Sequence, residues 1–371
     1  MKNNRTFLEK LLDGSEVEWK PLDEVANIAN NARKPVKSSL RISGNIPYYG
    51  ANNIQDYVEG YTHDGEFVLI AEDGSASLEN YSIQWAVGKF WANNHVHVVN
   101  GKEKLNNRFL YHYLTNMNFI PFLAGKERAK LTKAKLQQIP IPIPPLSVQT
   151  EIVRILDALT ALTSELTSEL ILRRKQYEYY REKLLSFDSL EQLNMGGAKK
   201  KLIDVAIIGT GSRNTNEAIE NGIYPFFVRS QEPKKINEYE FDETAIITAG
   251  DGVGVGKVFH YISGKYALHQ RAYRIVVTDK NLLPKFLFHY IRNNFAHYLK
   301  MTSVNSSVTS LRKPMFEKYP VFVPPLEEQH RIVSILDKFE TLTNSITEGL
   351  PLAIEQSQKR YEYYRELLLS F

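Results

Sequence analysis

An internal duplication constrains this chain more than any other feature of its sequence. The segment YEYYREKLLSF at residues 177–187 recurs as YEYYRELLLSF at 361–371, with ten of eleven positions identical. A second pair, PPLSVQTEIVRILD at 144–157 and PPLEEQHRIVSILD at 324–337, is offset by 180 residues, whereas the first pair is offset by 184. The later copy therefore has four extra residues between the two matches. A period of this length indicates a duplicated domain and not a solenoid.

The remainder of each copy corresponds more faintly. KPLDEVA (20–26) resembles KKLIDVA (200–206), FVLIAEDG (67–74) resembles AIITAGDG (245–252), and RFLYHYL (108–114) resembles KFLFHYI (285–291). The repeated helix-like segments are nearly identical, whereas these blocks keep a common skeleton and differ in detail. We therefore expect two copies that share a scaffold and recognise two different things.

The blocks read as a mixed α/β (α+β) fold. Short β-branched and aromatic runs such as FVLIA and RAYRIVV are separated by Gly, Asn and Asp, as strands of a sheet are. One helix is predicted after the strands of each block, at about residues 106–117 and 283–298. Proline-rich segments (IPIPIPPL and YPVFVPPL) close the blocks and precede long helices. The predicted segments are 1–19 (N-terminal, helical), 20–145 (first globular domain), 146–199 (central helix), 200–325 (second globular domain) and 326–371 (distal helix).

Each long helix carries one apolar stripe with steps of three and four residues, which is typical of a helix that packs on another helix. The stripes are Ile152, Ile155, Leu159, Leu162, Leu166 and Leu170 in the first copy, and Ile332, Ile335, Phe339, Leu342, Ile346 and Leu350 in the second. We expect the two helices to pack antiparallel and to close the chain into a pseudo-two-fold, circular arrangement. Gly349 and Pro351 predict a kink or break in the distal helix. A coiled-coil helix for oligomerisation is the alternative reading.

Composition narrows the functional classes. The chain of 371 residues is 43% apolar and 24% charged, as in ordinary globular proteins, and its lack of cysteine excludes disulfides, thiolate catalysis and cysteine-ligated metals. The sequence shows neither a secretion signal nor a membrane span, so we expect a cytoplasmic protein. Lys and Arg exceed Asp and Glu by 14 to 11 in residues 20–145 and by 17 to 11 in residues 200–325. Two mildly basic blocks suit contact with a polyanion.

The doubled Pro-Pro-Leu…Gln…Ile-Val…Leu-Asp helix start and the doubled YEYYRE segment resemble the specificity subunit of type I restriction–modification enzymes, over the whole chain. The resemblance implies two target-recognition domains, at 20–145 and 200–325, that bind the two half-sites of a bipartite double-stranded DNA sequence with a fixed gap. It also implies two methyltransferase subunits docked on the conserved helices, and restriction (motor) subunits in the full complex. S-adenosylmethionine, ATP and Mg²⁺ would then belong to those partners, with no cofactor in this chain.

Motifs for chemistry in the chain itself are missing. The two Pro-Pro pairs lack the Asn or Asp and the aromatic residue that an adenine methyltransferase needs. The segment AGDGVGVGKV (249–258) fails the P-loop pattern, because Val258 stands where a hydroxyl residue is required. A β-hairpin turn is the better interpretation. The histidines show no metal-ligand spacing. We therefore expect a non-catalytic subunit; an autonomous methyltransferase or nuclease and a coiled-coil scaffold are the alternatives.

Base edges are read by Arg at guanine and by Asn or Gln at adenine, while Lys and Arg bind phosphates. Such side chains lie in segments that align between the copies. The alternative is that Asn and Gly merely build turns there. The DNA-binding candidates of the first copy are Arg33, Lys34, Lys37, Tyr48, Tyr49, Asn52, Asn53, Asn93, Asn94, His95, Lys126, Arg128 and Lys130. Those of the second copy are Arg213, Asn214, Arg229, Ser230, Gln231, His269, Gln270, Arg271, Ser306, Ser307 and Arg312.

A tandem tetrad lies between the two blocks. TSEL at residues 163–166 is followed at once by TSEL at 167–170, and we predict that the pair is a spacer. Its residues are Thr163, Ser164, Glu165, Leu166, Thr167, Ser168, Glu169 and Leu170. A tetrad leaves a helical stripe nearly in phase, so its copy number can change the helix length without moving the stripe far. Replication slippage at a tolerant helix is the alternative explanation.

Overall fold

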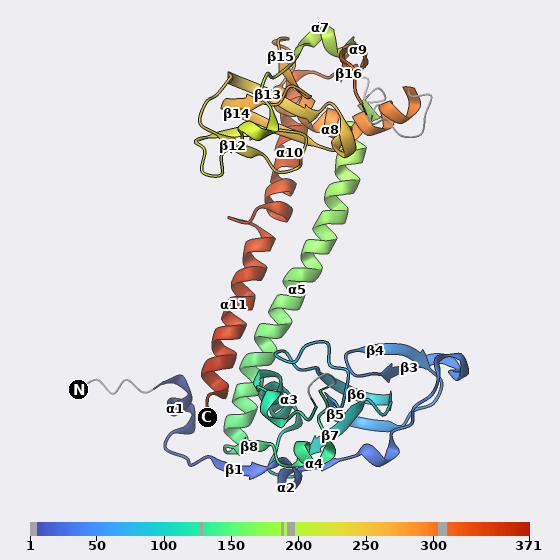
Figure 1. Cartoon of the computed structure of the whole chain (residues 1–371), viewed down its shortest axis with the longest axis vertical. Coiled ribbons are helices and arrows are strands. Elements are labelled where there is room, and N and C mark those ends of the chain that lie inside the picture. Colours follow the sequence, from blue (N-terminus) through green and yellow to red (C-terminus); the bar gives the residue numbers. More distant parts are fainter. Residues whose placement is uncertain (1–5, 126–128, 187–188, 191–196, 303–309) are drawn as a thin grey trace, which may run out of the picture. The chain divides into compact units, whose positions relative to one another are not determined.

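The computed structural model describes residues 6–125, 129–186, 189–190, 197–302 and 310–371 (Figure 1). The chain divides into two compact units. Unit 1 consists of Met1–Thr167 and Ala353–Phe371, and unit 2 of Ser168–Leu352. Each unit thus combines one globular block with part of the long helix that joins the blocks and part of the distal helical segment. The mixed α/β fold class and the helical joining segment predicted from the sequence are confirmed.

The sheet of unit 1 has six strands in the order β2-β7-β5-β6-β3-β4. Neighbours pair antiparallel except β3 and β6, which pair in parallel through Tyr48↔Trp91 and Tyr49↔Ala92. A separate ladder joins β1 to β8. The strands are β1 (Glu18–Pro21), β2 (Ala26–Ile28), β3 (Ser43–Tyr49), β4 (Ile54–Val58), β5 (His63–Ala71), β6 (Ile83–Ala92), β7 (Val96–Gly101) and β8 (Pro140–Ile143). The globular helices are α2 (Leu22–Val25), α3 (Asn107–Asn116) and α4 (Lys133–Gln137).

Unit 2 repeats this topology, in the order β10-β15-β13-β14-β11-β12, again with one parallel pair, β11 and β14. Its two-stranded ladder joins β16 to β9. The strands are β9 (Ala198–Lys201), β10 (Ala206–Thr210), β11 (Tyr224–Phe227), β12 (Lys234–Ile236), β13 (Phe241–Ala249), β14 (Phe259–Leu268), β15 (Ala272–Val277) and β16 (Pro320–Val323). The helices are α7 (Leu202–Val205), α8 (Pro284–Thr302) and α9 (Lys313–Glu317). Segment 250–258 joins the antiparallel strands β13 and β14, so the hairpin interpretation is confirmed.

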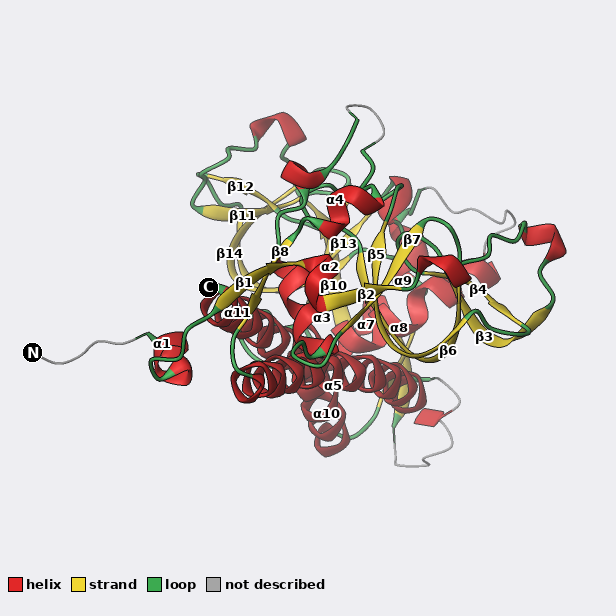
Figure 2. Ribbon diagram, turned by 90° about the horizontal axis from the view of Figure 1, so that it is seen from below, coloured by secondary structure: helices red, strands yellow, loops and turns green. Residues whose placement is uncertain are grey.

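The largest buried cluster of each unit joins side chains of the sheet to side chains of helices; Figure 2 colours the strands yellow and the helices red. In unit 1, α3 packs on β5, β6 and β7, and the central run Val68–Ala71 of β5 is fully buried. In unit 2, α8 packs on β13 and β14 in the same way. Strands buried on both faces read as continuous apolar runs, as the predicted strand segments FVLIA of β5 and AIITA of β13 do.

The repeated long helices complete both cores. Helix α5 (Leu146–Leu185) runs uninterrupted for 40 residues. Ile152 and Leu156, near its start, join the core of unit 1 together with Leu368 and Leu369 of α11 (Leu350–Leu369). Near its end, Tyr177 and Leu185 join the core of unit 2, with Ile332 and Leu336 of α10 (Leu326–Asn344). Each core therefore buries one helix start and one helix end, taken from different copies of the repeat.

The helices run antiparallel inside each unit. In unit 2, Arg174 of α5 donates to the Thr343 carbonyl, and Tyr177 and Tyr180 contact the ring of Phe339. Residue numbers thus rise along α5 as they fall along α10. In unit 1, the hydroxyl oxygens of Thr163 and Ser357 lie 2.8 Å apart across α5 and α11. Short helix α1 (Phe7–Leu12) also joins unit 1, with the ring of Phe7 6.3 Å from that of Tyr364.

The distal segment is broken where the sequence predicted it. Helix α10 ends at Asn344 and α11 begins at Leu350. Gly349 has a φ of +83°, and a Cβ there would lie 2.6 Å from the Thr341 carbonyl oxygen, so only glycine fits. Two stripe positions depart from expectation. Leu162 of α5 is 40% exposed. Ile346 falls in this break, and 79% of its surface is exposed. None of the helices in the described ranges combines the length and hydropathy of a membrane span.

Candidate nucleic-acid interface

Three loops meet at one edge of the sheet in each unit, because the strand register fixes where the strands end. In unit 1, Tyr49 at the end of β3 pairs with Ala92, and Ala71 at the end of β5 pairs with Val96. The loops at 50–53, 72–74 and 93–95 therefore share an edge. In unit 2, Phe227 pairs with Leu268 and Ala249 with Ala272, which brings the loops at 228–231, 250–252 and 269–271 together. Eleven of the 24 predicted DNA-binding residues lie in these six loops.

The register also defines which residues are equivalent between the units. Val96 and Ala272 occupy the same position, so His95 corresponds to Arg271, Asn94 to Gln270, and Asn93 to His269. In the loops after β3 and β11, Asn52 corresponds to Ser230 and Asn53 to Gln231. Three of the five matched positions thus carry different hydrogen-bonding groups, whereas Asn94 and Gln270, like Asn53 and Gln231, carry the same carboxamide on side chains of different length.

The turn that presents His95 or Arg271 is built alike in both units. The Asn93 amide N–H donates to the Tyr49 carbonyl, and the Asn93 side-chain oxygen accepts the His95 N–H at 2.8 Å. In unit 2 the His269 N–H donates to the Phe227 carbonyl, and His269 Nδ1 accepts the Arg271 N–H at 3.0 Å. Asn93 and His269 are 4% and 5% exposed. These two predicted contact residues shape the turn in the structure; any contact they make with DNA stays a prediction.

In unit 2 an aspartate holds two of the predicted arginines. Asp251 lies 2.8 Å from Nη1 of Arg229 and 3.2 Å from Nη1 of Arg271. Burial alone would raise the pKa of Asp251, but the two guanidinium groups outweigh it and lower the pKa. Arg271 remains 62% and Arg229 41% exposed along the side chain. Because one carboxylate faces two cations, the cluster keeps a net positive charge and free guanidinium donors.

The equivalent aspartate of unit 1, Asp73, lies 2.5 Å from Nδ1 of His95. The neighbouring Glu72 binds Nη1 of Arg33 at 2.7 Å and Nζ of Lys130 at 2.8 Å. Burial raises the pKa of Glu72, but hydrogen bonds from Lys130 and Arg33 more than offset this and lower the pKa. Arg33 also donates to the Val96 carbonyl, so it braces the loops at this edge.

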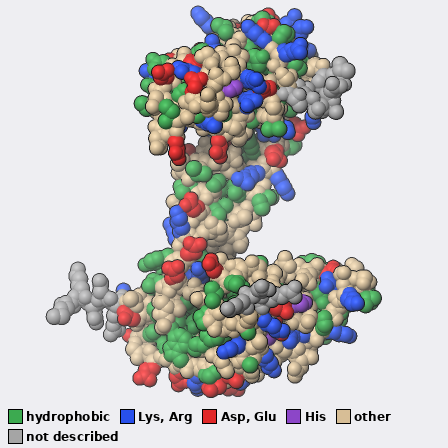
Figure 3. Space-filling model, viewed as in Figure 1, with side chains coloured by type: hydrophobic (Ala, Val, Ile, Leu, Met, Phe, Trp, Pro, Cys, Tyr) green, Lys and Arg blue, Asp and Glu red, His purple; other side chains and the backbone are tan. Residues whose placement is uncertain are grey.

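Each cluster borders a hollow. In unit 1 a cavity of about 780 Å³ is lined by residues that include Asn52, Asp73, His95 and Lys130. In unit 2 a smaller cavity of about 270 Å³ is lined by residues that include Asp251, Gln270 and Arg271. On the visible face of the molecule, lysine and arginine side chains are interspersed with carboxylates rather than gathered into one basic surface (Figure 3). Local ion-pair clusters therefore describe the charge better than a continuous basic patch.

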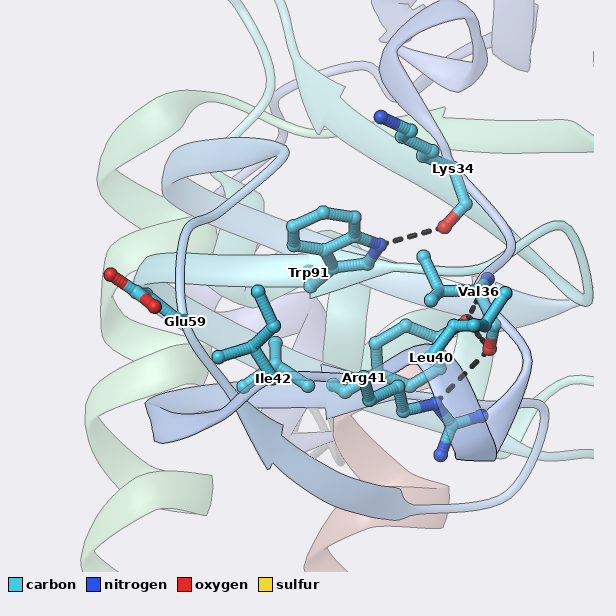
Figure 4. A pocket seen from close by; sticks show the side chains of 9 residues that line it. Lys34, Val36, Leu40, Arg41, Ile42, Glu59 and Trp91 are labelled. Carbon is cyan, nitrogen blue, oxygen red and sulfur yellow. Dashed lines mark hydrogen bonds between the residues drawn. The ribbon is translucent and has the colours of Figure 1, made fainter.

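A third hollow, of about 290 Å³, lies beside the loop that carries Lys34 (Figure 4). Its walls include the side chains of Val36, Ile42 and Trp91, and the Trp91 indole N–H donates to the Lys34 carbonyl at 2.7 Å. Tyr48, another predicted contact residue, is 1% exposed, and its hydroxyl accepts the Val36 N–H at 3.0 Å. These two hydrogen bonds hold the cationic loop 33–37 against the sheet.

The other predicted residues are distributed as follows. Arg213 binds Glu217 and Glu238, and the Gln270 side-chain nitrogen lies 2.5 Å from the Asn214 oxygen. The predicted residues that are exposed are Lys34, Lys37, Asn52, Asn53, Asn94, Ser230 and Gln231. Tyr49 is half-buried. Arg312 is exposed at the start of α9. Lys126, Arg128, Ser306 and Ser307 lie outside the described residues. All eight residues of the TSEL pair lie within α5, and DNA contact by any residue stays a prediction.

Sequence reasoning missed the acidic residues that hold these cations. Asp73 and Asp251 are aligned in FVLIAEDG and AIITAGDG, so the alignment of the copies was the available signal. It also missed the glutamine of the Pro-Pro-Leu motif. The Gln329 side chain accepts the Leu283 N–H at 2.8 Å and donates to the carbonyls of Asn281 and Pro324, and Gln149 makes the equivalent bonds in unit 1. This glutamine ties the start of the long helix to the loop before the globular helix.

Carboxylates on α5 and α10 form a second connection between a long helix and a globular helix. Asp157 of α5 binds Arg108 and His112 of α3, with 2.8 Å between its Oδ1 and Nε2 of His112. In unit 2, Asp337 binds Nε2 of His289 at 2.8 Å. His289, Asp337 and Glu340 place ligand atoms within 4.8 Å of one another, as a metal site would. Lys285 pairs with Asp337 and Arg292 pairs with Glu340. His289, Asp337 and Glu340 therefore belong to a salt-bridge network between α8 and α10, which explains their proximity without a metal ion.

The buried His97 predicts a pH dependence of stability. Asn30 Nδ2 donates to His97 Nδ1, so Nε2–H donates to the Leu131 carbonyl, and burial lowers the pKa of His97 below 6.5. The unfolded chain therefore takes up a proton at a higher pH than the folded chain. We expect the free energy of unfolding, measured by urea denaturation, to fall from pH 7.5 to pH 5.5. His97→Gln should reduce this slope; an unchanged slope would refute the assignment.

Comparison with known proteins agrees with this architecture. The family model described as type I restriction modification DNA specificity domain matches residues 14–173 and again residues 196–356. A Haemophilus influenzae protein assigned as a type I restriction enzyme specificity subunit is 64% identical, with all of both chains covered. The Escherichia coli EcoR124I/EcoR124II specificity subunit is 33% identical over 99% of this chain and 97% of its own.

A solved structure has the same fold. The S subunit of a type I restriction–modification system from M. genitalium superimposes with a TM-score of 0.61 at 15% identity. The superposition covers 100% of this chain and 96% of that one.

Proposed function

Because this chain belongs to the type I restriction–modification DNA specificity family and is a DNA-recognition subunit, we propose that its two units each read one half of a bipartite DNA target. The observation that carries the proposal is the pair of equivalent loop clusters with unlike side chains. His95 faces Asp73 at the position where Arg271 faces Asp251. An exposed arginine suits a guanine edge or a phosphate, whereas Asn94 suits an adenine edge. Its equivalent Gln270 also suits adenine, but its carboxamide stands on a longer side chain. The two half-sites should therefore differ.

The same proposal assigns the conserved helices to assembly. Tyr179 and Tyr363 occupy equivalent positions of the two YEYYRE segments and are 56% and 62% exposed. Exposed aromatic side chains are frequent anchors in protein interfaces. One such anchor in each unit supports the docking of two identical methyltransferase subunits. In this account restriction subunits join the same complex, and S-adenosylmethionine, ATP and Mg²⁺ are bound by the partners.

Co-expression tests this function against the alternatives. The chain is expressed alone, its methyltransferase partner alone, and the two together, and host DNA is sequenced for N6-methyladenine. We expect a gapped methylated motif only when both are present. Methylation by this chain alone would indicate an autonomous enzyme, and no methylation in the co-expression would indicate a scaffold without a DNA role.

The TSEL pair should set the gap between the half-sites. One tetrad adds about 6 Å of helix and a net rotation of about 40°, and one base pair of DNA adds about 3.4 Å and about 35°. The rotations agree, and tilt of the helix would take up the difference in rise. Inserting a third TSEL after Leu170 should therefore lengthen the gap by about one base pair and leave both half-sites unchanged. Methylation mapping would refute the spacer role if the gap stayed constant while a half-site changed.

A further inference from the structure

Two connections run between the units, and they contain different numbers of residues. Helix α5 has 40 residues. Helices α10 and α11 have 19 and 20, so 39 residues of the second connection are helical. Yet the second connection contains 44 residues from Leu326 to Leu369, the positions equivalent to Leu146 and Leu185. The helical lengths match, and the excess lies in the five residues Ser345–Gly349.

These five residues form a compact, folded-back turn. The Ser345 N–H donates to the Thr341 carbonyl, and the Ser345 hydroxyl accepts the N–H groups of Thr347 and Glu348 at 3.3 and 3.2 Å. The positive φ of Gly349 returns the chain against the last turn of α10. The turn therefore takes up residues without adding a turn of helix.

Little tertiary packing holds the turn in place. Ile346 is 79% exposed, and Ser345 is the only half-buried residue among positions 344–348. If the helix continued, Ile346 would lie one turn beyond the half-buried Leu342 on the same stripe. The bonds that shape the turn are local, so it can open without disrupting either core.

We propose that residues 345–349 are a length reserve that determines how long α5 can be, and hence which gaps between half-sites the chain can adopt. The second connection is one tetrad longer in sequence than the first and stores that tetrad in the turn. An α5 with a third TSEL would have 44 residues, which equals the 44 residues of the second connection. The part of the proposal that concerns the DNA gap rests on the proposed function; the part that concerns the turn does not.

The reserve predicts an asymmetry between lengthening and shortening. When α5 is lengthened by one tetrad, about 6 Å of extra span is needed, and five residues in extended form supply more than this. When one TSEL is removed, α5 has fewer residues than α10 and α11 together, and opening the turn cannot compensate. Gly349 and Pro351 disfavour a continuous helix, so we expect the turn to open as extended chain.

Four variants test the proposal as a cycle: the parent, the TSEL insertion, a deletion of residues 345–348, and the two changes combined. Insertion alone should fold, because the turn opens. Deletion alone should fold, because the second connection is then as long as α5. The combination leaves a mismatch of four residues, and we expect at least a tenfold loss of folded, methylation-competent complex relative to either single change. If the combined variant lost no more than the two single changes together, the reserve would be excluded.

The distance between spin labels on α10 and α11 reports directly whether the turn has opened, and its measurement needs no DNA. The chain has no cysteine, so Lys338→Cys and Gln356→Cys give unique spin-label sites on exposed positions of α10 and α11. We expect the distance between the labels to increase by about 6 Å in the insertion variant. A matched pair within α11, Gln356→Cys with Arg360→Cys, should not change. An unchanged Lys338–Gln356 distance would overturn the reserve, whereas a longer distance with an unaltered methylated gap would overturn only the spacer role of TSEL.

Discussion

Replacing Gln329 by alanine should lower the free energy of unfolding by about 3–4 kcal/mol, because each buried group left without a partner costs about 1–3 kcal/mol. The side chain is fully buried and makes hydrogen bonds of 2.8, 2.8 and 2.6 Å to the backbone of Leu283, Asn281 and Pro324. Its loss leaves one N–H and two carbonyls unpaired. For a unit of this size, the midpoint of thermal unfolding should fall by about 10 °C.

The equivalent glutamine of unit 1 gives a second test, and an exposed glutamine gives the control. Gln149→Ala should have a similar effect, since Gln149 is also fully buried and bonded to Asn106, Lys104 and Pro144. Gln356→Ala, at an exposed position of α11, should change the unfolding free energy by less than about 0.5 kcal/mol. Calorimetry that placed all three variants within 1–2 °C of the parent would contradict the role assigned to the motif glutamine.

Replacing Arg229 and Arg271 together by alanine should weaken binding of the assembled complex to its target duplex by about 100-fold or more. Each well-placed arginine contact to a base or phosphate is worth about 1–3 kcal/mol. Both guanidinium groups are preoriented by Asp251 at an exposed edge of unit 2, so little side-chain order has to be gained on binding. The measurement is a titration of the methylation-mapped duplex at fixed ionic strength, repeated at several salt concentrations.

The salt series separates the kinds of contact. Loss of phosphate contacts should reduce the slope of log K against log salt by about one for each contact, whereas loss of a base contact should relax sequence preference in one half-site only. Lys265→Ala removes an exposed cation of β14 that lies opposite Asp242 in the strand register and outside the three loops. It should change the affinity less than about threefold. Equal effects of Lys265→Ala and the double variant would show that only overall charge matters.

The duplication explains why much of the fold could be predicted from the sequence. Buried runs such as FVLIA and AIITA mark the central strands β5 and β13, and the stripes on the long helices predicted antiparallel helix packing. Gly349 and Pro351 marked the break between α10 and α11. These features depend on local patterns, which the sequence carries directly.

The candidate site was predictable only in part, because it depends on which side chains face one another. The loops at the sheet edge were identified by their Asn, Arg and Gln residues, but burial decides between a contact residue and a turn former. Asn93 and His269 cap the turns, whereas the adjacent His95 and Arg271 project from them. Asp73 and Asp251 are not among the predicted residues, because only side chains that can donate hydrogen bonds to bases or phosphates were selected from the sequence. Their role follows from register, which pairs residues distant in sequence.

A domain exchange within the chain tests most directly whether each unit reads its own half-site. Residues 200–325 are replaced by a second copy of residues 20–145. The repeated segments YEYYREKLL and YEYYRELLL are nearly identical, so we expect either block to pack on either helix end. Co-expressed with its methyltransferase partner, this variant should methylate a motif in which both halves are the half-site of unit 1. A methylated motif that kept two different halves would contradict the account.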